Sequence, residues 1–423
     1  MSFLKSVFWI FLAGNFASFG NFLYNLAMGR MLSPADYGEL EAILSLSVLF
    51  AVPLSVLSTF IVKIVSSYWG QNKKIEIKTF LAVYRRRFLL ISIVGSILLL
   101  FFSPIIIRFL NLGSILSVIF LSLLFLLSGL TIVNNGGLGG TLSFGFLAIN
   151  GITGTTIKLI TSVILVFLNF QLSGAFLGPL LGTLVAFALS FIELRNIFKN
   201  VKETKKIPKD ILKETFFPTL FASLAITLFL TVDVILARHF FSESVSGEFA
   251  AVAVLGKIIY YAIGPVISVM FPLISARAAN GTSHVLPLLG SLAMVFGVGS
   301  LIGFIFIMFP VFILNTLFDG KYLNGASYLG TYSLFMTIFS INSVLTHFLL
   351  AISYFRPMWL LFCLSAFAGI LMILFHGSIS QLIWINVSVS FLYFVVVSTL
   401  VCRHINFRSL FLSTVRQKPL SGI

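Results

Sequence analysis

Apolar stretches of about 20 residues follow one another along almost the whole sequence. A helix of that length spans the ~30 Å hydrocarbon core of a bilayer, so each stretch can form a transmembrane helix. Hydrophobic residues make up 59% of the chain and charged residues only 9%, whereas a soluble domain carries roughly 25% charged residues. The sequence therefore predicts an all-α polytopic membrane protein with no soluble domain of its own.

Hydropathy read in windows of about 19 residues predicts twelve transmembrane helices. The first stretch continues to Met28, which makes it longer than the apolar region of a cleaved signal peptide, so it is taken as the first span. The approximate ranges are 6–28, 40–66, 88–110, 115–135, 152–170, 175–195, 215–236, 248–272, 287–316, 328–352, 358–377 and 381–402.

Lysine and arginine residues are divided unequally between the two ends of these spans. Only four fall on one side: Arg30, Arg108, Arg238 and Lys321. Basic residues favour cytoplasmic loops, so both termini are expected in the cytoplasm, with the protein in the plasma membrane. This bias also accounts for the net charge of +15, and no nucleic-acid partner is expected. The other side carries Lys5, Lys73, Lys74, Lys78, Arg85, Arg86, Arg87, Arg195, Lys199, Lys202, Lys205, Lys206, Lys209, Lys213, Arg277, Arg356, Arg403, Arg408, Arg416 and Lys418.

The two halves of the sequence repeat each other at a nearly constant offset of 206 to 209 residues. Six predicted spans separate the matched residues, so the halves enter the membrane in the same direction and are related by an axis along its normal. Chance similarity between apolar helices is the alternative. The matched pairs are Arg30 with Arg238, Gly38 with Gly247, Ser66 with Ser275 and Pro104 with Pro310.

The repeat predicts two six-helix lobes and hence a transporter. Substrate is expected to bind between the lobes near the middle of the membrane, and rocking of the lobes to expose it to each side in turn. The expected divisions are an N-terminal lobe at 1–195, a basic cytoplasmic linker at 196–214, a C-terminal lobe at 215–402 and a cytoplasmic tail at 403–423.

Residues 27–40, which read AMGRMLSPADYGEL, resemble the aRxLgPxdyG signature of the Wzx-type polysaccharide flippases. These belong to the multidrug/oligosaccharidyl-lipid/polysaccharide exporter superfamily, and the resemblance continues through residues 172–179, 231–237 and 317–322. It implies a flippase that moves lipid-pyrophosphate-linked oligosaccharide from the cytoplasmic to the outer leaflet by alternating access. The glycine-rich residues 135–141 depart from the pattern, since a basic or aromatic residue is expected in a loop there.

Four ionisable residues fall inside the predicted spans. A charge in mid-membrane costs roughly 2.5–3.5 kcal/mol on insertion scales, so it usually faces a cavity or a partner. Lys257 lies ~15 Å from the outer end of its span and is the leading candidate for contact with a substrate phosphate. Asp233 either lines the cavity or forms an ion pair with Lys257. Lys63 and Lys158 lie near predicted cytoplasmic ends, where they line the cavity or extend to the headgroups.

Further candidate binding residues carry polar groups at the outer ends of spans or along them. Arg30 and Arg238 either anchor their helices at the interface or bind a pyrophosphate at the outer mouth as the lobes open. Sugar hydroxyls can be contacted by Asn21, Asn25, Tyr24, Tyr260 and Tyr261, although at helical spacing such residues are more often packing residues.

No metal site, cofactor or catalytic residue is expected. The five histidines are dispersed, and no GxxxxGK[ST] phosphate loop is present. Cys363 and Cys402 both fall in apolar spans and are expected to be small core residues. Export of an anion can instead be driven by the membrane potential, which contributes ~2.3 kcal/mol per charge per 100 mV.

Three other classes of membrane protein are alternatives. A cation-coupled multidrug antiporter of the same superfamily needs intramembrane carboxylates, and Asp233 is the only deep one expected. A major-facilitator transporter needs a GxxxDRxGRR element that residues 68–87 lack. A glycan polymerase or glycosyltransferase needs a catalytic surface loop, and the outer loops are short. The expected partners are therefore the lipid-pyrophosphate oligosaccharide, the bilayer and glycan-assembly enzymes. The protein itself is expected to be a monomer.

Overall fold

The computed structural model describes residues 3–199, 201, 213–279 and 282–404, and helices dominate this part of the chain. The first half forms α1 (Phe3–Met31), α2 (Pro34–Gly70), α3 (Lys74–Phe101), α4 (Ser103–Leu110), α5 (Ile115–Gly140), α6 (Phe144–Leu165) and α7 (Gln171–Ile197). The second half forms α8 (Lys213–Phe240), α9 (Glu243–Ala262), α10 (Gly264–Ala279), α11 (Val285–Met308), α12 (Pro310–Phe318), α13 (Ala326–Ala351), α14 (Met358–Leu374) and α15 (Ile379–His404).

Helices cover all twelve predicted segments, which confirms the all-α membrane fold. Within the described residues, eight helical runs are long and apolar enough to cross a membrane, or nine if the bent pair α3–α4 counts as one. Three features account for the difference from twelve. The run Phe144–Ile197 contains both α6 and α7, which pack against each other, α14 is a shorter apolar helix, and α1 is not among the counted runs.

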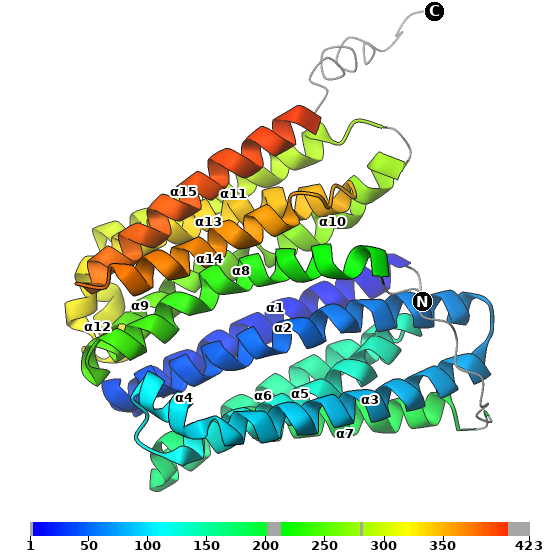
Figure 1. The fold of residues 1–423 in the computed structure, drawn as a ribbon, viewed down its shortest axis with the longest axis horizontal. Helices are drawn as coiled ribbons and strands as arrows, with labels where there is room; N and C mark the ends of the chain where they lie inside the picture. The colour runs from blue at the N-terminus through cyan, green and yellow to red at the C-terminus, as the bar shows by residue number, and fades with distance from the viewer. Residues whose placement is uncertain (1–2, 200, 202–212, 280–281, 405–423) are drawn as a thin grey trace, which may run out of the picture.

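The helices form two groups that meet along α1, α2, α8 and α9 (Figure 1). In the first group α2, α3 and α7 pack on α5, and α1 packs on α6. In the second group α9, α11 and α15 pack on α13, and α8 packs on α14. Between the groups, α2 lies against both α8 and α9. The expected linker, 196–214, falls largely outside the described residues, as does the tail beyond His404.

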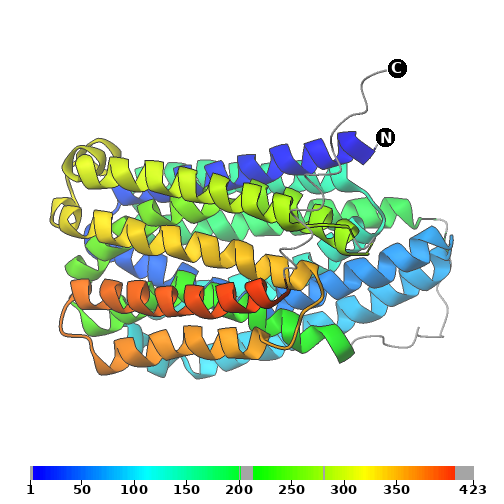
Figure 2. The same cartoon turned by 90° about the horizontal axis from the view of Figure 1, so that it is seen from above.

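One end of the molecule carries α4 and α12 together with the α1–α2 and α8–α9 turns (Figure 1, left). We call it the outer face, after the orientation that the basic residues predict, and the opposite end the inner face. Figure 2 shows the first turns of α1 and the last turns of α15 at the inner face. This arrangement agrees with an even number of crossings.

Equivalent helix breaks near the outer face support the parallel repeat. The span of α3 bends by 61° into α4 at Phe102, and the span of α11 is interrupted before α12 at Phe309. Proline stands in the first turn after each break, where its missing N–H costs no hydrogen bond. Each short helix then ends on a residue in the left-handed conformation, Asn111 with φ 47° and Asp319 with φ 56°.

The glycine-rich residues 135–141 form the last turns of α5 rather than a loop, which corrects the expectation from the sequence. A Cβ on Gly140 would lie 2.4 Å from Cβ of Val65 on α2, and one on Gly136 would lie 2.8 Å from Ile61. Small residues let membrane helices approach closely, so these glycines serve packing of α5 against α2.

The two cysteines were expected to be core residues, and the structure corrects this prediction. Cys363 on α14 and Cys402 on α15 are both free and exposed. Their hydrophobic surroundings in the sequence reflect helix faces turned to lipid, where apolar residues are as favourable as they are in a core.

Candidate substrate cavity between the two lobes

A cavity of about 780 Å³ lies between the two groups of helices. Five helices of the first group and two of the second contribute to its wall. Its polar or charged lining residues are Asn15, Ser18, Asn21, Asn25, Glu41, Ser45, Ser47, Ser128, Thr131, Asn135, Asn150, Thr155, Lys158, Thr183, Thr231, Lys257 and Tyr261. A site built from both lobes changes shape when the lobes move, as transport by alternating access requires.

Lys257 enters this cavity from α9, where its side chain is 7% exposed. Within the described residues it forms no ion pair within 4.0 Å, so the direct pair with Asp233 is absent. The carboxylate of Asp233 instead accepts hydrogen bonds from the Tyr332 hydroxyl at 2.7 Å, from the Val234 backbone N–H at 2.8 Å and from Asn386 Nδ2 at 3.4 Å. The Lys257 ammonium is therefore available to an anion in the cavity.

Lys158 supplies a second ammonium group, from α6. Its Nζ donates to Asn21 Oδ1 at 2.9 Å and lies 3.9 Å from the centre of the Tyr24 ring. The sequence placed Lys158 near the cytoplasmic end because it began this span at residue 152. The helix begins at Phe144, so Lys158 lies about four turns inside it and cannot simply extend to the inner headgroups.

Glu41 is the charged residue of the cavity wall that was not predicted from the sequence. The predicted span began at residue 40, which put Glu41 at the membrane edge, but α2 begins at Pro34 and buries the Glu41 side chain to 5% exposure. Its Oε1 has no hydrogen-bond partner. The carboxyl group interacts electrostatically with Lys257 and Lys158. The sequence does carry a signal for this earlier start of α2, because a serine followed by proline is typical of the beginning of a helix. In the structure the Ser33 hydroxyl accepts a hydrogen bond from the Asp36 N–H at 3.2 Å.

Five asparagines add neutral polar groups to the wall: Asn15, Asn21, Asn25, Asn135 and Asn150. Of these, Asn21 and Asn25 were predicted from the sequence. Asn150 Nδ2 donates to Asn135 Oδ1 at 3.3 Å, which joins the inner ends of α5 and α6. Amide groups both donate and accept, so such a wall can bind sugar hydroxyls in several orientations.

The remaining candidates are not among the residues that line this cavity. Lys63 is exposed on α2, about two turns before the helix ends at the inner face. Asp233 is held by its polar partners, and Tyr260 packs with its ring centre 5.2 Å from that of Phe339. Arg30 and Arg238 lie at the outer face, where each contacts the opposite lobe.

A sequence profile of the family described as "Polysaccharide biosynthesis protein" matches residues 3–277. No curated protein matches the sequence. An inward-facing multidrug resistance MATE family transporter of the MOP superfamily superposes with a TM-score of 0.73 at 15% identity, covering 90% of this chain and 94% of that one. The lipid II flippase MurJ, in an inward closed conformation, superposes with a TM-score of 0.71 at 18% identity, covering 97% and 94%.

An outward-facing MATE transporter superposes less closely, with a TM-score of 0.67 at 14% identity over 98% and 97% of the two chains. At these identities the likeness shows the fold alone, which is the fold that this chain shares with these membrane proteins. The profile covers well over half of the chain and carries the family assignment. The chain therefore belongs to the polysaccharide biosynthesis protein family, as a multi-pass helical membrane protein.

Proposed function

We propose that the protein is a flippase for a lipid-linked oligosaccharide carrying a phosphate or pyrophosphate, which it moves from the cytoplasmic to the outer leaflet of the plasma membrane. Both termini then lie in the cytoplasm. Lys257 and Lys158 hold the anionic phosphate group, and the asparagines on the cavity wall hold the sugars.

The observation that carries this proposal is that two ammonium groups from opposite lobes line one cavity rich in asparagine. Lys158 comes from α6 of the first group and Lys257 from α9 of the second. A multiply charged anion can bridge them, and the bridge breaks when the lobes separate. Binding then depends on the state of the transporter, as net movement across the membrane requires.

Glu41 is the observation that favours the second candidate, a cation-coupled multidrug antiporter. A buried carboxylate with an unpartnered oxygen can bind a cation or an organic ammonium. Two lysines in the same cavity oppose such binding, so we rank this function below the flippase.

The test is transport by the purified protein in liposomes that contain a fluorescent polyprenyl-pyrophosphate oligosaccharide, scored by the accessibility of the glycan at each leaflet. Lys257→Gln and Lys158→Gln should each lower the rate at least tenfold, because each leaves a phosphate charge uncompensated in the cavity. Lys63→Gln is the matched control, since Lys63 lies outside the cavity, and it should transport at the parent rate.

Two results would overturn the proposal. One is parent-level transport in the Lys257→Gln/Lys158→Gln double variant while its melting temperature is also unchanged. The other is uptake of a cationic dye that depends on Glu41 and is indifferent to both lysines, which would establish the antiporter instead.

A further inference from the structure

We propose that Arg30 and Arg238 form a two-fold-related latch that holds the outer face shut, each by binding the end of the broken helix in the opposite lobe. The inference rests on the alternating access of the proposed function. It adds the device that keeps the cavity closed on the outer side while substrate loads from the inner side.

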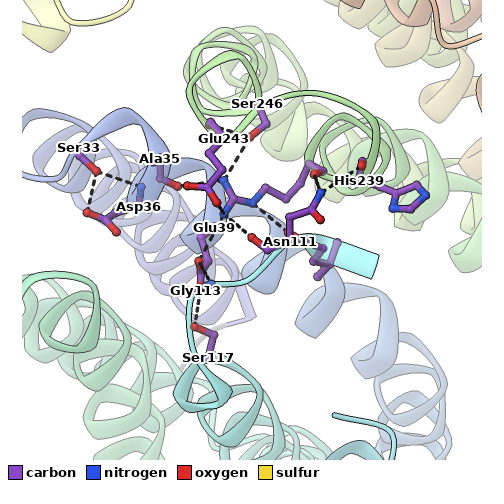
Figure 3. A network of polar contacts seen from close by, with 12 residues as sticks. Ser33, Ala35, Asp36, Glu39, Asn111, Gly113, Ser117, His239, Glu243 and Ser246 are labelled. Carbon is purple, nitrogen blue, oxygen red and sulfur yellow. Dashed lines mark hydrogen bonds and ion pairs between the residues drawn. The ribbon is translucent and has the colours of Figure 1, made fainter. Parts of the chain in front are cut away.

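Arg238, in the last turn of α8, reaches across to the first lobe. Figure 3 shows the surroundings of this contact, where Ala35, Glu39 and Asn111 of the first lobe lie beside Glu243 and Ser246 of the second. Its Nε donates to the Leu110 carbonyl at 3.0 Å and an Nη donates to the Asn111 carbonyl at 2.9 Å, at the end of α4. The guanidinium also donates to the Ala35 carbonyl at 3.2 Å and to Glu39 Oε2 at 3.4 Å. Arg238 is 1% exposed, so the first lobe encloses a residue of the second.

Arg30, in the last turn of α1, makes the reciprocal crossing. Its Nε donates to the Leu317 carbonyl at 2.6 Å, and an Nη donates to the Thr316 carbonyl, both in the last turn of α12. A residue of the second lobe also contacts the first: Lys321 Nζ donates to the Arg30 carbonyl and, at 3.1 Å, to the Leu32 carbonyl.

The two crossings are equivalent in the repeat. Arg30 and Arg238 are 208 residues apart, and so are the left-handed residues Asn111 and Asp319 that end α4 and α12. Asn111 in turn donates hydrogen bonds to the second lobe, from Nδ2 to the Arg238 and His239 carbonyls at 3.4 and 3.3 Å. An arrangement repeated on both sides of a pseudo-two-fold axis is a feature of the fold rather than of one loop.

The chemistry suits a reversible lock. The last carbonyls of a helix lack partners within it and carry its partial negative charge, so a guanidinium with several donors binds them well. When the lobes part, carbonyls and guanidinium can each be hydrated, because they lie at the outer face and not in hydrocarbon. No buried polar group is then left without a hydrogen-bond partner, and the latch can close again.

The latch can be tested from the separation of the two lobes, without any substrate. Spin labels are placed at Ile105→Cys on α4 and Val311→Cys on α12, two exposed and equivalent positions, after Cys363 and Cys402 are replaced by serine. The distance between the labels is then measured by pulsed electron paramagnetic resonance in lipid nanodiscs. The parent should show mainly the closed distance.

Arg238→Ala and Arg30→Ala should each raise the population at longer distances several-fold, and the double variant should raise it further. Arg30→Lys should lie between Arg30→Ala and the parent, since an ammonium keeps the charge without the fork. Arg108→Ala is the matched control, an exposed arginine at the same face, and should match the parent.

Distance distributions in Arg30→Ala that coincide with the parent would overturn the latch, as would an equal shift in Arg108→Ala. Arg30 is exposed, so this variant remains informative even if the buried Arg238→Ala fails to fold. A failure here leaves the proposed flippase standing, because its own test measures transport and depends on the cavity lysines.

Discussion

Glu41 lies among the charges of the cavity and partly offsets them. One carboxylate beside the two ammonium groups of Lys158 and Lys257 leaves the site with a net positive charge. A low-dielectric wall strengthens these interactions relative to water. In the empty protein Glu41 therefore stabilises the lysines, and an anionic substrate must compete with it for them.

Glu41→Gln should accordingly strengthen anion binding. Removal of one competing negative charge is expected to lower the Kd of inorganic pyrophosphate about tenfold, or about 1.4 kcal/mol, measured by calorimetry on the purified protein. Glu248→Gln, outside the cavity, is the control and should bind like the parent. Weaker binding in Glu41→Gln would mean that the carboxylate positions the anion rather than competes with it.

Asp233 has a structural role at the same scale. Its carboxylate is 1% exposed and accepts the Tyr332 hydroxyl at 2.7 Å. Tyr332→Phe removes that donor and leaves a buried acceptor under-satisfied, at a cost of about 1–3 kcal/mol. A fall of several degrees in the melting temperature is expected, with Tyr328→Phe unchanged as the control; equal melting temperatures would show that other donors replace the hydroxyl.

Among the helices, α2 and α9 approach most closely where the two repeats meet. A Cβ on Gly38 would lie 2.9 Å from the Gly247 backbone nitrogen, and one on Gly247 would lie 1.8 Å from the Pro34 carbonyl oxygen. The two glycines are equivalent residues of the repeat that touch across its axis. Closure of the outer face therefore depends on the absence of two methyl groups.

Gly247→Ala should push the lobes apart at this contact without touching either latch arginine. The labels on α4 and α12 should report longer distances, because the closed arrangement of the outer face should be destabilised. Gly290→Ala is the matched control, since nothing lies within 4 Å of a Cβ added there. An unchanged distance in Gly247→Ala would show that α2 and α9 can shift along each other while the face stays shut.

For the whole molecule, the cavity lies on the inner side of the outer-face contacts. Its wall continues to Asn135 and Asn150, near the inner ends of α5 and α6, whereas both arginines lie at the outer ends of α1 and α8. The molecule is thus closed outside in this state.

A carrier that moves a net negative charge outward should respond to the membrane potential. An imposed potential of 100 mV, negative on the loading side, should favour the outer leaflet by ~2.3 kcal/mol per net charge, or about 50-fold in the equilibrium ratio. Glycan accessibility in liposomes with a potassium diffusion potential measures this ratio. No response would mean that the lysines move with the substrate and cancel its charge, or that another ion is exchanged.

The sequence by itself determined the membrane fold, the twelve apolar segments that are helical and the parallel repeat. These follow from local hydropathy and from residues that recur at one offset, so no contact between distant residues is needed to infer them. The same reasoning placed Arg30 and Arg238 as an equivalent pair at the outer ends of their helices.

Only the tertiary structure decided what these residues touch. A helix start moved by six or eight residues took Glu41 and Lys158 from the membrane edge into the cavity. Asp233 found partners on α13 and α15 instead of Lys257, and the arginines bound carbonyls of the other lobe. Backbone carbonyls carry no signature in a sequence, and contacts across almost 300 residues are set by how the lobes pack.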